Sequence, residues 1–196
     1  MMQLLVLAAV LLIQTNSSPD SVFREELENY LARAPFKMSY HYIVEQGDFR
    51  QEETDTLFIA GAGRFRLPIW DKIYGSDGYS LFLHDRNTHQ TIIDSLRWSD
   101  VNLWVRLLNG QLPSGVVVTG IENSSGRFVY HLAYGSLWEG LVVADTTTWA
   151  IREIILTELV DQYRHHVLLE PLVPWTAASP RMTTLEDLVG TRIDLR

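Results

Sequence analysis

The sequence predicts an α+β protein, mainly antiparallel β, folded as an unclosed half-barrel of about ten to eleven strands with helices covering its concave face. Residues 36–96 alternate apolar and polar side chains over consecutive short runs separated by turns. A strongly apolar helix is expected directly afterwards, at Ser99–Gly110, and further short strands fill residues 115–170. One strongly curved antiparallel sheet accommodates this many strands with so few helices.

The N-terminus carries a targeting segment. Leu4–Ile13 is an uninterrupted apolar run followed by polar residues. As a helix it would be about 15 Å long, roughly half the thickness of a bilayer core. We therefore predict a signal peptide over residues 1–18 and export of the remainder.

Composition narrows the compartment and the class of ligand. The chain has 196 residues, 46% of them hydrophobic, which suits one domain with a sizeable core. A net charge of −8 argues against nucleic-acid binding. The absence of cysteine excludes a lipidated N-terminal cysteine and disulfides. We expect a protein of a bacterial envelope that is soluble after signal-peptide removal.

Residues 19–170 form the predicted half-barrel domain. It begins with an amphipathic helix at Pro19–Ala34, capped by Ser18. In the first strand, Phe36–Glu45, every second side chain is bulky and apolar. The later strands are expected at Gln51–Ala60, Arg64–Ile69, Tyr79–His84, Thr88–Leu96, Gly115–Glu122, Gly126–Tyr134, Leu137–Ala144, Thr148–Leu159 and Tyr163–Glu170.

Residues 171–196 read as a proline-containing C-terminal extension. Thr183 and Glu186 form a capping-box pattern before a short helix that ends near Gly190.

Polar residues give no catalytic or metal-ligating constellation, so we expect no enzyme, no metal and no cofactor. His165 and His166 are adjacent, and neighbouring strand residues point to opposite faces, which favours a surface strand over metal binding. His84, Asp85, Asn87 and His89 cluster at a hairpin, where a solvated turn is the simpler interpretation. A hydrolase built around His84, Asp85 and His89 is the least favoured alternative.

Several segments, in their order and spacing, resemble the LolA family of periplasmic lipoprotein carriers. TLFIAGAGRFRL (56–67) is similar to the family's strand–turn–strand, Ser76-Asp77-Gly78 to its SDG hairpin, and YSLFLHDRN (79–87) to the strand that follows. VNLWVRLLNG (101–110) resembles its short lid helix. In the family, an arginine often stands just before the second strand of that strand–turn–strand segment. Gly61 and Ala62 stand there in this chain, and Arg64 is the candidate substitute for lid control.

The resemblance implies a non-catalytic carrier that binds the acyl chains of lipoproteins in an apolar cavity and delivers them toward the outer membrane. It implies acylated lipoproteins, an inner-membrane lipoprotein-release transporter and an outer-membrane acceptor as partners. It also implies a monomer in the periplasm of a Gram-negative bacterium. The candidate cavity and lid residues, which taken alone would indicate ordinary core, are Met38, Tyr40, Tyr42, Leu57, Ile59, Phe65, Leu67, Leu81, Leu83, Val101, Trp104, Val105 and Leu108. The alternative is a non-transporting envelope sensor or interaction module of the same fold, with a filled core.

Overall fold

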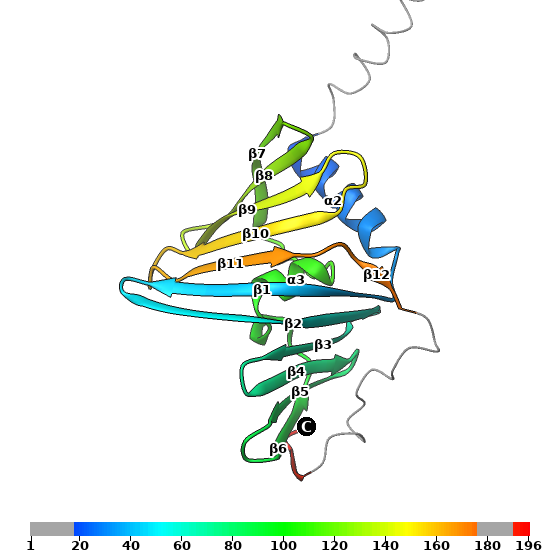
Figure 1. The fold of residues 1–196 in the computed structure, drawn as a ribbon, viewed down its shortest axis with the longest axis vertical. Helices are drawn as coiled ribbons and strands as arrows, with labels where there is room; N and C mark the ends of the chain where they lie inside the picture. Colours follow the sequence, from blue (N-terminus) through cyan, green and yellow to red (C-terminus); the bar gives the residue numbers. More distant parts are fainter. Residues whose placement is uncertain (1–17, 176–189) are drawn as a thin grey trace, which may run out of the picture.

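A computed structural model of the chain describes residues 18–175 and 190–196, and one large sheet of thirteen strands dominates it (Figure 1). The elements in chain order are α2 (Pro19–Leu31), β1 (Phe36–Gln46), β2 (Phe49–Gly61), β3 (Arg64–Ile69), β4 (Lys72–Asp77), β5 (Ser80–Asp85), β6 (Gln90–Ser95), a 3₁₀ turn (Trp98–Asp100), α3 (Leu103–Leu108), β7 (Val116–Ser124), β8 (Arg127–Tyr134), β9 (Trp138–Asp145), β10 (Ile151–Glu158), β11 (Arg164–Leu169), β12 (Val173–Pro174) and β13 (Thr191–Asp194).

The sheet consists of two antiparallel meanders that meet at β1. Its strand order is β13-β6-β5-β4-β3-β2-β1-β11-β10-β9-β8-β7, and the short β12 pairs with the beginning of β1. The two ends of this order, β13 and β7, do not pair with each other in the described part of the chain. The predicted mainly antiparallel, unclosed sheet is therefore confirmed.

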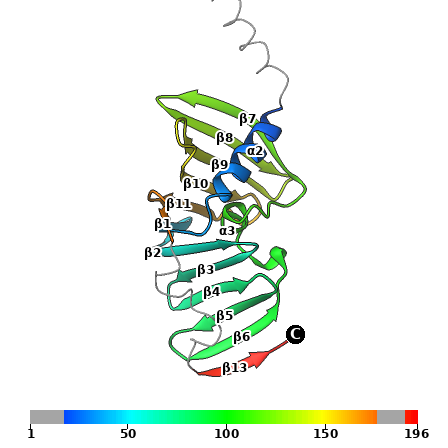
Figure 2. The ribbon, with the colours of Figure 1, turned by 90° about the vertical axis from the view of Figure 1, so that its right-hand side faces the viewer.

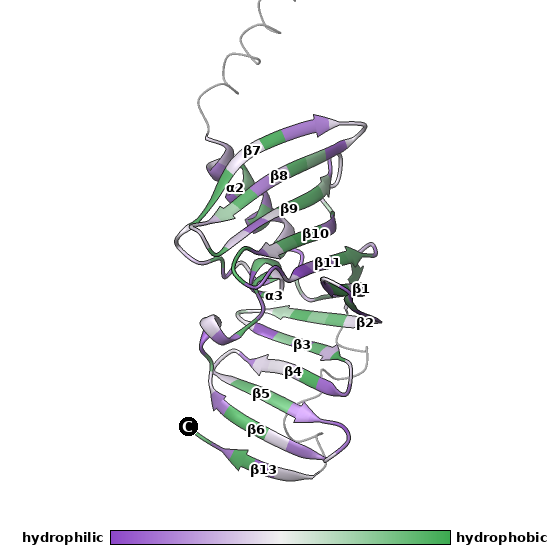
Figure 3. Cartoon of the chain, turned by 90° about the vertical axis from the view of Figure 1, so that its left-hand side faces the viewer, coloured by the Kyte–Doolittle hydropathy of each residue, from purple (hydrophilic) through white to green (hydrophobic). Residues whose placement is uncertain are grey.

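The alternation in β1 defines the two faces of the sheet. Phe36, Met38, Tyr40 and Tyr42 are at most 3% exposed, and with Val44 they lie on what we call the inner face. Met38 is paired with Leu57 of β2, which is also buried on this face. Hydrophobic and hydrophilic residues alternate along many strands in Figure 3. The period of two read from the sequence thus identified the buried face correctly.

Helix α2 packs against the inner face of the β7–β10 meander. As predicted, Ser18 caps it: the backbone N–H of Ser21 donates to the Ser18 hydroxyl over 3.2 Å. Phe23 lies with its ring centroid 4.9 Å from that of Tyr130 in β8. Figure 2 shows the helix lying across these strands. It ends at Leu31, three residues before the predicted end.

Helix α3 lies in the connection between β6 and β7, which are far apart in the strand order. This connection must therefore cross the sheet, and the buried residues of α3 join the same core cluster as those of α2 and the inner face (Figures 1 and 3). The predicted helix at Ser99–Gly110 was too long. Its first part is a 3₁₀ turn, and the N-cap of α3 is Asn102, which makes no side-chain cap bond.

The predicted number of strands was too low. Three strands escaped the sequence analysis: β4, β12 and β13. Two of them lie in the predicted C-terminal extension, and its described parts pair with β1 and β6. The predicted signal peptide and the predicted helix at residues 183–190 fall on positions outside the described residues, except Ser18 and Gly190.

Candidate functional site

A pocket lined by six apolar or aromatic and two polar residues lies between the β3–β5 strands and the N-terminal part of α3. It has a volume of about 210 Å³. Phe65 and Leu67 of β3 reach it because they share the inner face with their cross-strand neighbours Ser76 and Tyr74. We call it the strand-side pocket. It is lined by Phe65, Leu67, Tyr74, Leu81, Asp100, Val101, Asn102 and Val105.

A second space, the loop-side pocket, lies on the other side of residues 100–102 and also has a volume of about 210 Å³. It shares Asp100, Val101 and Asn102 with the strand-side pocket and adds Leu103, Arg106 and the rings of β8 and β9. The Arg106 guanidinium donates to the Gln111 carbonyl over 3.2 Å, and partial burial lowers its pKa. Residues 100–102, which precede α3, line both pockets and therefore separate them.

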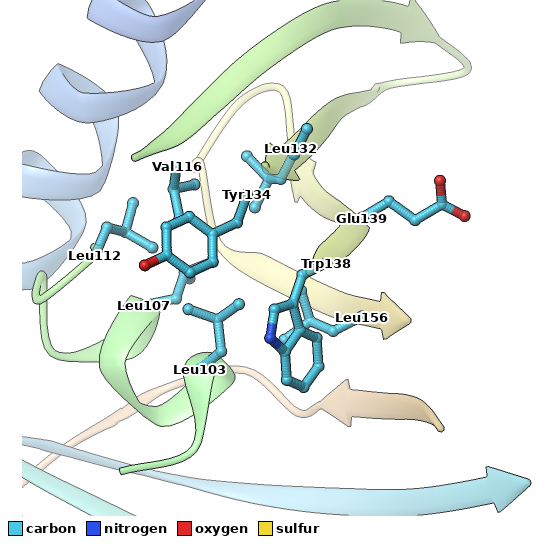
Figure 4. Close-up of a pocket in the computed structure, with 10 residues that line it drawn as sticks. Leu103, Leu107, Leu112, Val116, Leu132, Tyr134, Trp138, Glu139 and Leu156 are labelled. Atoms are coloured by element: carbon cyan, nitrogen blue, oxygen red, sulfur yellow. The ribbon is translucent and has the colours of Figure 1, made fainter. Parts of the chain in front are cut away.

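Beyond the loop-side pocket, the space narrows to about 10 Å³. Figure 4 shows Leu103 and Leu107 of α3 facing Tyr134 and Trp138, while the Glu139 carboxylate points away. Close packing here fixes α3 against β8 and β9. Around α3, the larger open spaces are therefore at its N-terminal end.

Twelve of the thirteen residues predicted for the cavity fall into two groups, and Leu83 belongs to neither. The structure brings Phe65, Leu67, Leu81, Val101 and Val105 together around the strand-side pocket. Leu83 is half-buried and paired with Tyr74. The remaining residues pack in the core and are at most 3% exposed: Met38, Tyr40, Tyr42, Leu57, Ile59, Trp104 and Leu108.

Arg64, the candidate for lid control, lies at the β2–β3 turn. Its guanidinium donates to the carbonyls of Ala60 and Gly61 over 3.3 and 3.4 Å. Phe65, the next residue, points to the inner face, so Arg64 belongs to the outer face. Arg64 thus supports the turn Gly61–Gly63. The basic residue that lines a pocket is Arg106, in the loop-side pocket.

Sequence analysis missed three lining residues of the strand-side pocket and misjudged the exposure of His165. Tyr74 belongs to β4, which was not predicted, and Asp100 and Asn102 belong to the segment taken as helix. His165 and His166 do point to opposite faces, but only His166 matches the surface interpretation, pairing with Glu153 over 2.6 Å. The His165 side chain is 12% exposed, so a surface strand was wrong for it.

His165 takes part in a polar group within the inner face. Its Nδ1 lies 2.7 Å from the Tyr42 hydroxyl, and its Nε2 lies 3.4 Å from a Glu158 carboxylate oxygen. An Nε2–H donating to Glu158 leaves Nδ1 to accept from Tyr42. Trp138, which lines the loop-side pocket, has its ring centroid 5.5 Å from that of His165. The polar group therefore adjoins the pocket wall.

This imidazole is expected to make stability depend on pH. Burial lowers the pKa of His165, and the hydrogen bond and charge of Glu158 oppose that shift. The unfolded chain then binds more protons as pH falls through about 6.5, so stability decreases in that direction. His165→Asn should flatten the dependence of the unfolding free energy on pH between about 7 and 5, by up to about 1.4 kcal/mol per pH unit. Chemical denaturation at several pH values measures the unfolding free energy. His131→Asn is the control, because that side chain is 38% exposed. If His165→Asn keeps the pH slope of the wild type, the prediction is wrong.

The polar cluster at the β5–β6 hairpin is only partly a solvated turn. The Asp85 carboxylate accepts from the backbone of Asn87 and Thr88, as expected of a turn. His84, however, is 6% exposed, and its Nδ1 lies 2.9 Å from the Thr91 hydroxyl.

Within residues 18–175 and 190–196, no group of three or more potential ligands could hold a metal ion. In the same ranges, no helix has the length and apolar character needed to cross a bilayer.

Comparison with known proteins supports the fold. No protein-family model and no curated protein sequence matches this chain. Among solved structures, an uncharacterized conserved protein from Thermus thermophilus is similar with a TM-score of 0.54 at 8% identity, covering 87% of this chain and 97% of that one. A DUF1329 family protein from Desulfovibrio piger gives 0.52 at 7%, covering 88% and 100%.

LolA superfamily proteins are also among the similar structures. One from Nitrosomonas europaea has a TM-score of 0.41 at 10% identity, covering 76% of this chain and 94% of that chain. At these identities the likeness concerns the fold alone.

Proposed function

We propose that this protein is a non-catalytic carrier of the bacterial periplasm that binds acyl chains of lipoproteins and delivers them toward the outer membrane. In this proposal, the inner face is the concave side of a half-barrel, and α2 and α3 cover it. The partners would be acylated lipoproteins, a transporter that releases them from the inner membrane, and an acceptor at the outer membrane.

The observation that carries the proposal is the strand-side pocket. Six of its lining residues are aliphatic or aromatic, and its volume is about 210 Å³. An apolar cavity of about 150 Å³ is large enough to bind benzene, so the pocket can receive the end of an acyl chain. Burial would contribute about 0.8 kcal/mol per methylene. A partly inserted chain would thus be held firmly and still be transferable.

The proposal is tested by purifying the mature chain and titrating it with a fluorescent fatty-acyl probe. We expect saturable binding with one site, and acylated protein that co-purifies with the chain. The readouts are probe fluorescence and mass spectrometry of the purified material. Failure to take up the probe and to retain acylated protein would contradict a carrier.

A second candidate is a non-transporting envelope sensor or interaction module. It is favoured by the seven predicted cavity residues that are packed in the core, including Tyr40, Tyr42 and Trp104. Such a module needs a filled core and no acyl uptake. The same titration separates the two functions, because only the carrier requires saturable probe binding.

A further inference from the structure

The two pockets beside residues 100–102 have equal volumes but different linings. Six of the eight residues of the strand-side pocket are apolar or aromatic. Four of the nine residues of the loop-side pocket are polar: Ser99, Asp100, Asn102 and Arg106. The rings of Tyr134 and Trp138 belong to the same lining and face α3 in Figure 4. A pocket of this mixed lining suits a group that carries both apolar and hydrogen-bonding parts.

Arg106 has hydrogen-bonding capacity to spare in this pocket. A guanidinium carries five N–H donors. The Nε–H donates to the Gln111 carbonyl over 3.2 Å, and the Nη atoms donate to no residue within 18–175 and 190–196. Burial lowers the pKa of Arg106, so these donors are partly shielded from water, and a hydrogen bond made there is stronger than one in bulk water. The Nη atoms of Arg106 are therefore suited to bind oxygen acceptors.

Asp100 restricts the charge of the group that fits. The residue is exposed and lines both pockets, and its carboxylate accepts from the Ser99 hydroxyl over 3.0 Å. Among the described residues that line the loop-side pocket, Asp100 and Arg106 carry the formal charges, and these cancel. An anionic group would be repelled by Asp100 and a cationic one by Arg106. A neutral group with carbonyl oxygens for Arg106 and N–H donors for Asp100 complements both.

We propose that the loop-side pocket binds the ester and amide junction that links acyl chains to a polypeptide. The carbonyl oxygens of the junction accept from the Arg106 Nη atoms, and its N–H groups donate to Asp100. The inference rests on the proposed function, because the acyl chain itself occupies the strand-side pocket. Asp100, Val101 and Asn102 line both pockets, so a ligand that lies across this segment reaches both. Arg106 and Asp100 thereby select an acylated polypeptide over a bare hydrocarbon and over an anionic phospholipid.

Three fluorescent probes with chains of the same length separate these ligands: a lipopeptide whose cysteine carries a diacylglyceryl group, a phosphatidylglycerol, and an alkane. Each is titrated against the purified chain and its variants. Arg106→Met removes the donors and keeps an apolar stem. Arg97→Met is the matched control, because Arg97 is exposed and lines neither pocket. Asp100→Ala tests the second contact at an exposed position and leaves the hydrogen bond from Arg106 to Gln111 in place. The free energy of unfolding, measured for each variant, identifies any loss of binding that comes from unfolding.

We expect the wild type to bind the lipopeptide more tightly than the other two probes. Arg106→Met and Asp100→Ala should each weaken lipopeptide binding by at least about tenfold, the loss expected for a hydrogen bond to a charged group. Alkane binding by both variants should stay within about twofold of that of the wild type, and Arg97→Met should bind all three probes as the wild type does.

Equal losses of lipopeptide and alkane binding in Arg106→Met would overturn the inference, because the residue would then act through the packing of α3. Tighter binding of phosphatidylglycerol than of the lipopeptide would overturn it in favour of an anionic head group. If the wild type binds the alkane as tightly as the lipopeptide, the loop-side pocket does not recognise the junction, and the inference fails while the carrier remains supported. Binding of none of the three probes would overturn the proposed function itself.

Discussion

Replacing Trp104 with alanine is expected to lower the free energy of unfolding by about 3–5 kcal/mol. Trp104 is 1% exposed, and its ring centroid lies 5.8 Å from that of Tyr40 and 5.7 Å from that of Tyr42. The substitution would leave a cavity where α3 meets β1, the strand shared by both meanders. Denaturant titration followed by circular dichroism measures the change.

Trp104→Phe is the matched control. The indole Nε1 of Trp104 is buried, and no described residue accepts a hydrogen bond from it. Phenylalanine removes this unsatisfied donor and keeps most of the apolar volume. We expect its cost to be well below that of alanine. Equal losses for the two variants would show that the hydrogen-bonding atom, and not the packed ring, determines stability at this position.

Val101→Trp is expected to weaken binding of a fatty-acyl probe by at least about tenfold. Val101 lines both the strand-side and the loop-side pockets, so a larger side chain there would occupy space that the proposed ligand needs. A tenfold loss corresponds to about 1.4 kcal/mol, or the burial of roughly two methylenes. Fluorescence titration of the purified variant measures the effect.

The control for pocket filling is Val160→Trp, which adds the same ring at an exposed position in the β10–β11 turn. It should bind the probe as the wild type does. Both variants should retain the circular dichroism spectrum of the wild type. If Val101→Trp binds the probe unchanged, the strand-side pocket is not the acyl site.

The long central strands were the most predictable part of the fold. Apolar residues occupy every second position from Phe36 to Val44, and Ile43 is the one apolar residue between them, so the period of two predicts both the strand and its buried face. The SDG hairpin was also correctly predicted, since Asp77 accepts from the backbone of Tyr79 and Ser80, and Gly78 has φ +100°. Local turn chemistry and period-two alternation are properties of adjacent residues, and a sequence displays them directly.

Features that depend on distant parts of the chain were not predictable. β13 has four exposed residues and is a strand only because it pairs with β6. The N-terminal part of the predicted helix is extended at Val101 and Asn102, where the chain turns to cross the sheet. The cavity was predicted only in part, because Leu57 in the core and Leu67 at the pocket obey the same inward alternation. Periodicity shows which side chains point inward, and whether space remains among them depends on α3.

The position of β1 between the two meanders has a consequence for how the protein forms. Tyr40 pairs with Asp55 soon after it in the sequence, but with Leu169 near the opposite end of the chain. During synthesis, one side of β1 must therefore wait for nearly the whole polypeptide before its hydrogen bonds are made. Most strands of this sheet pair with their neighbours in the sequence, but the β1–β11 pairing closes a long loop, and the entropy of closing it makes that pairing a slow step of folding. Until β11 is made, β1 has one unpaired edge at the centre of the future sheet, and such an edge is a template for pairing with other chains.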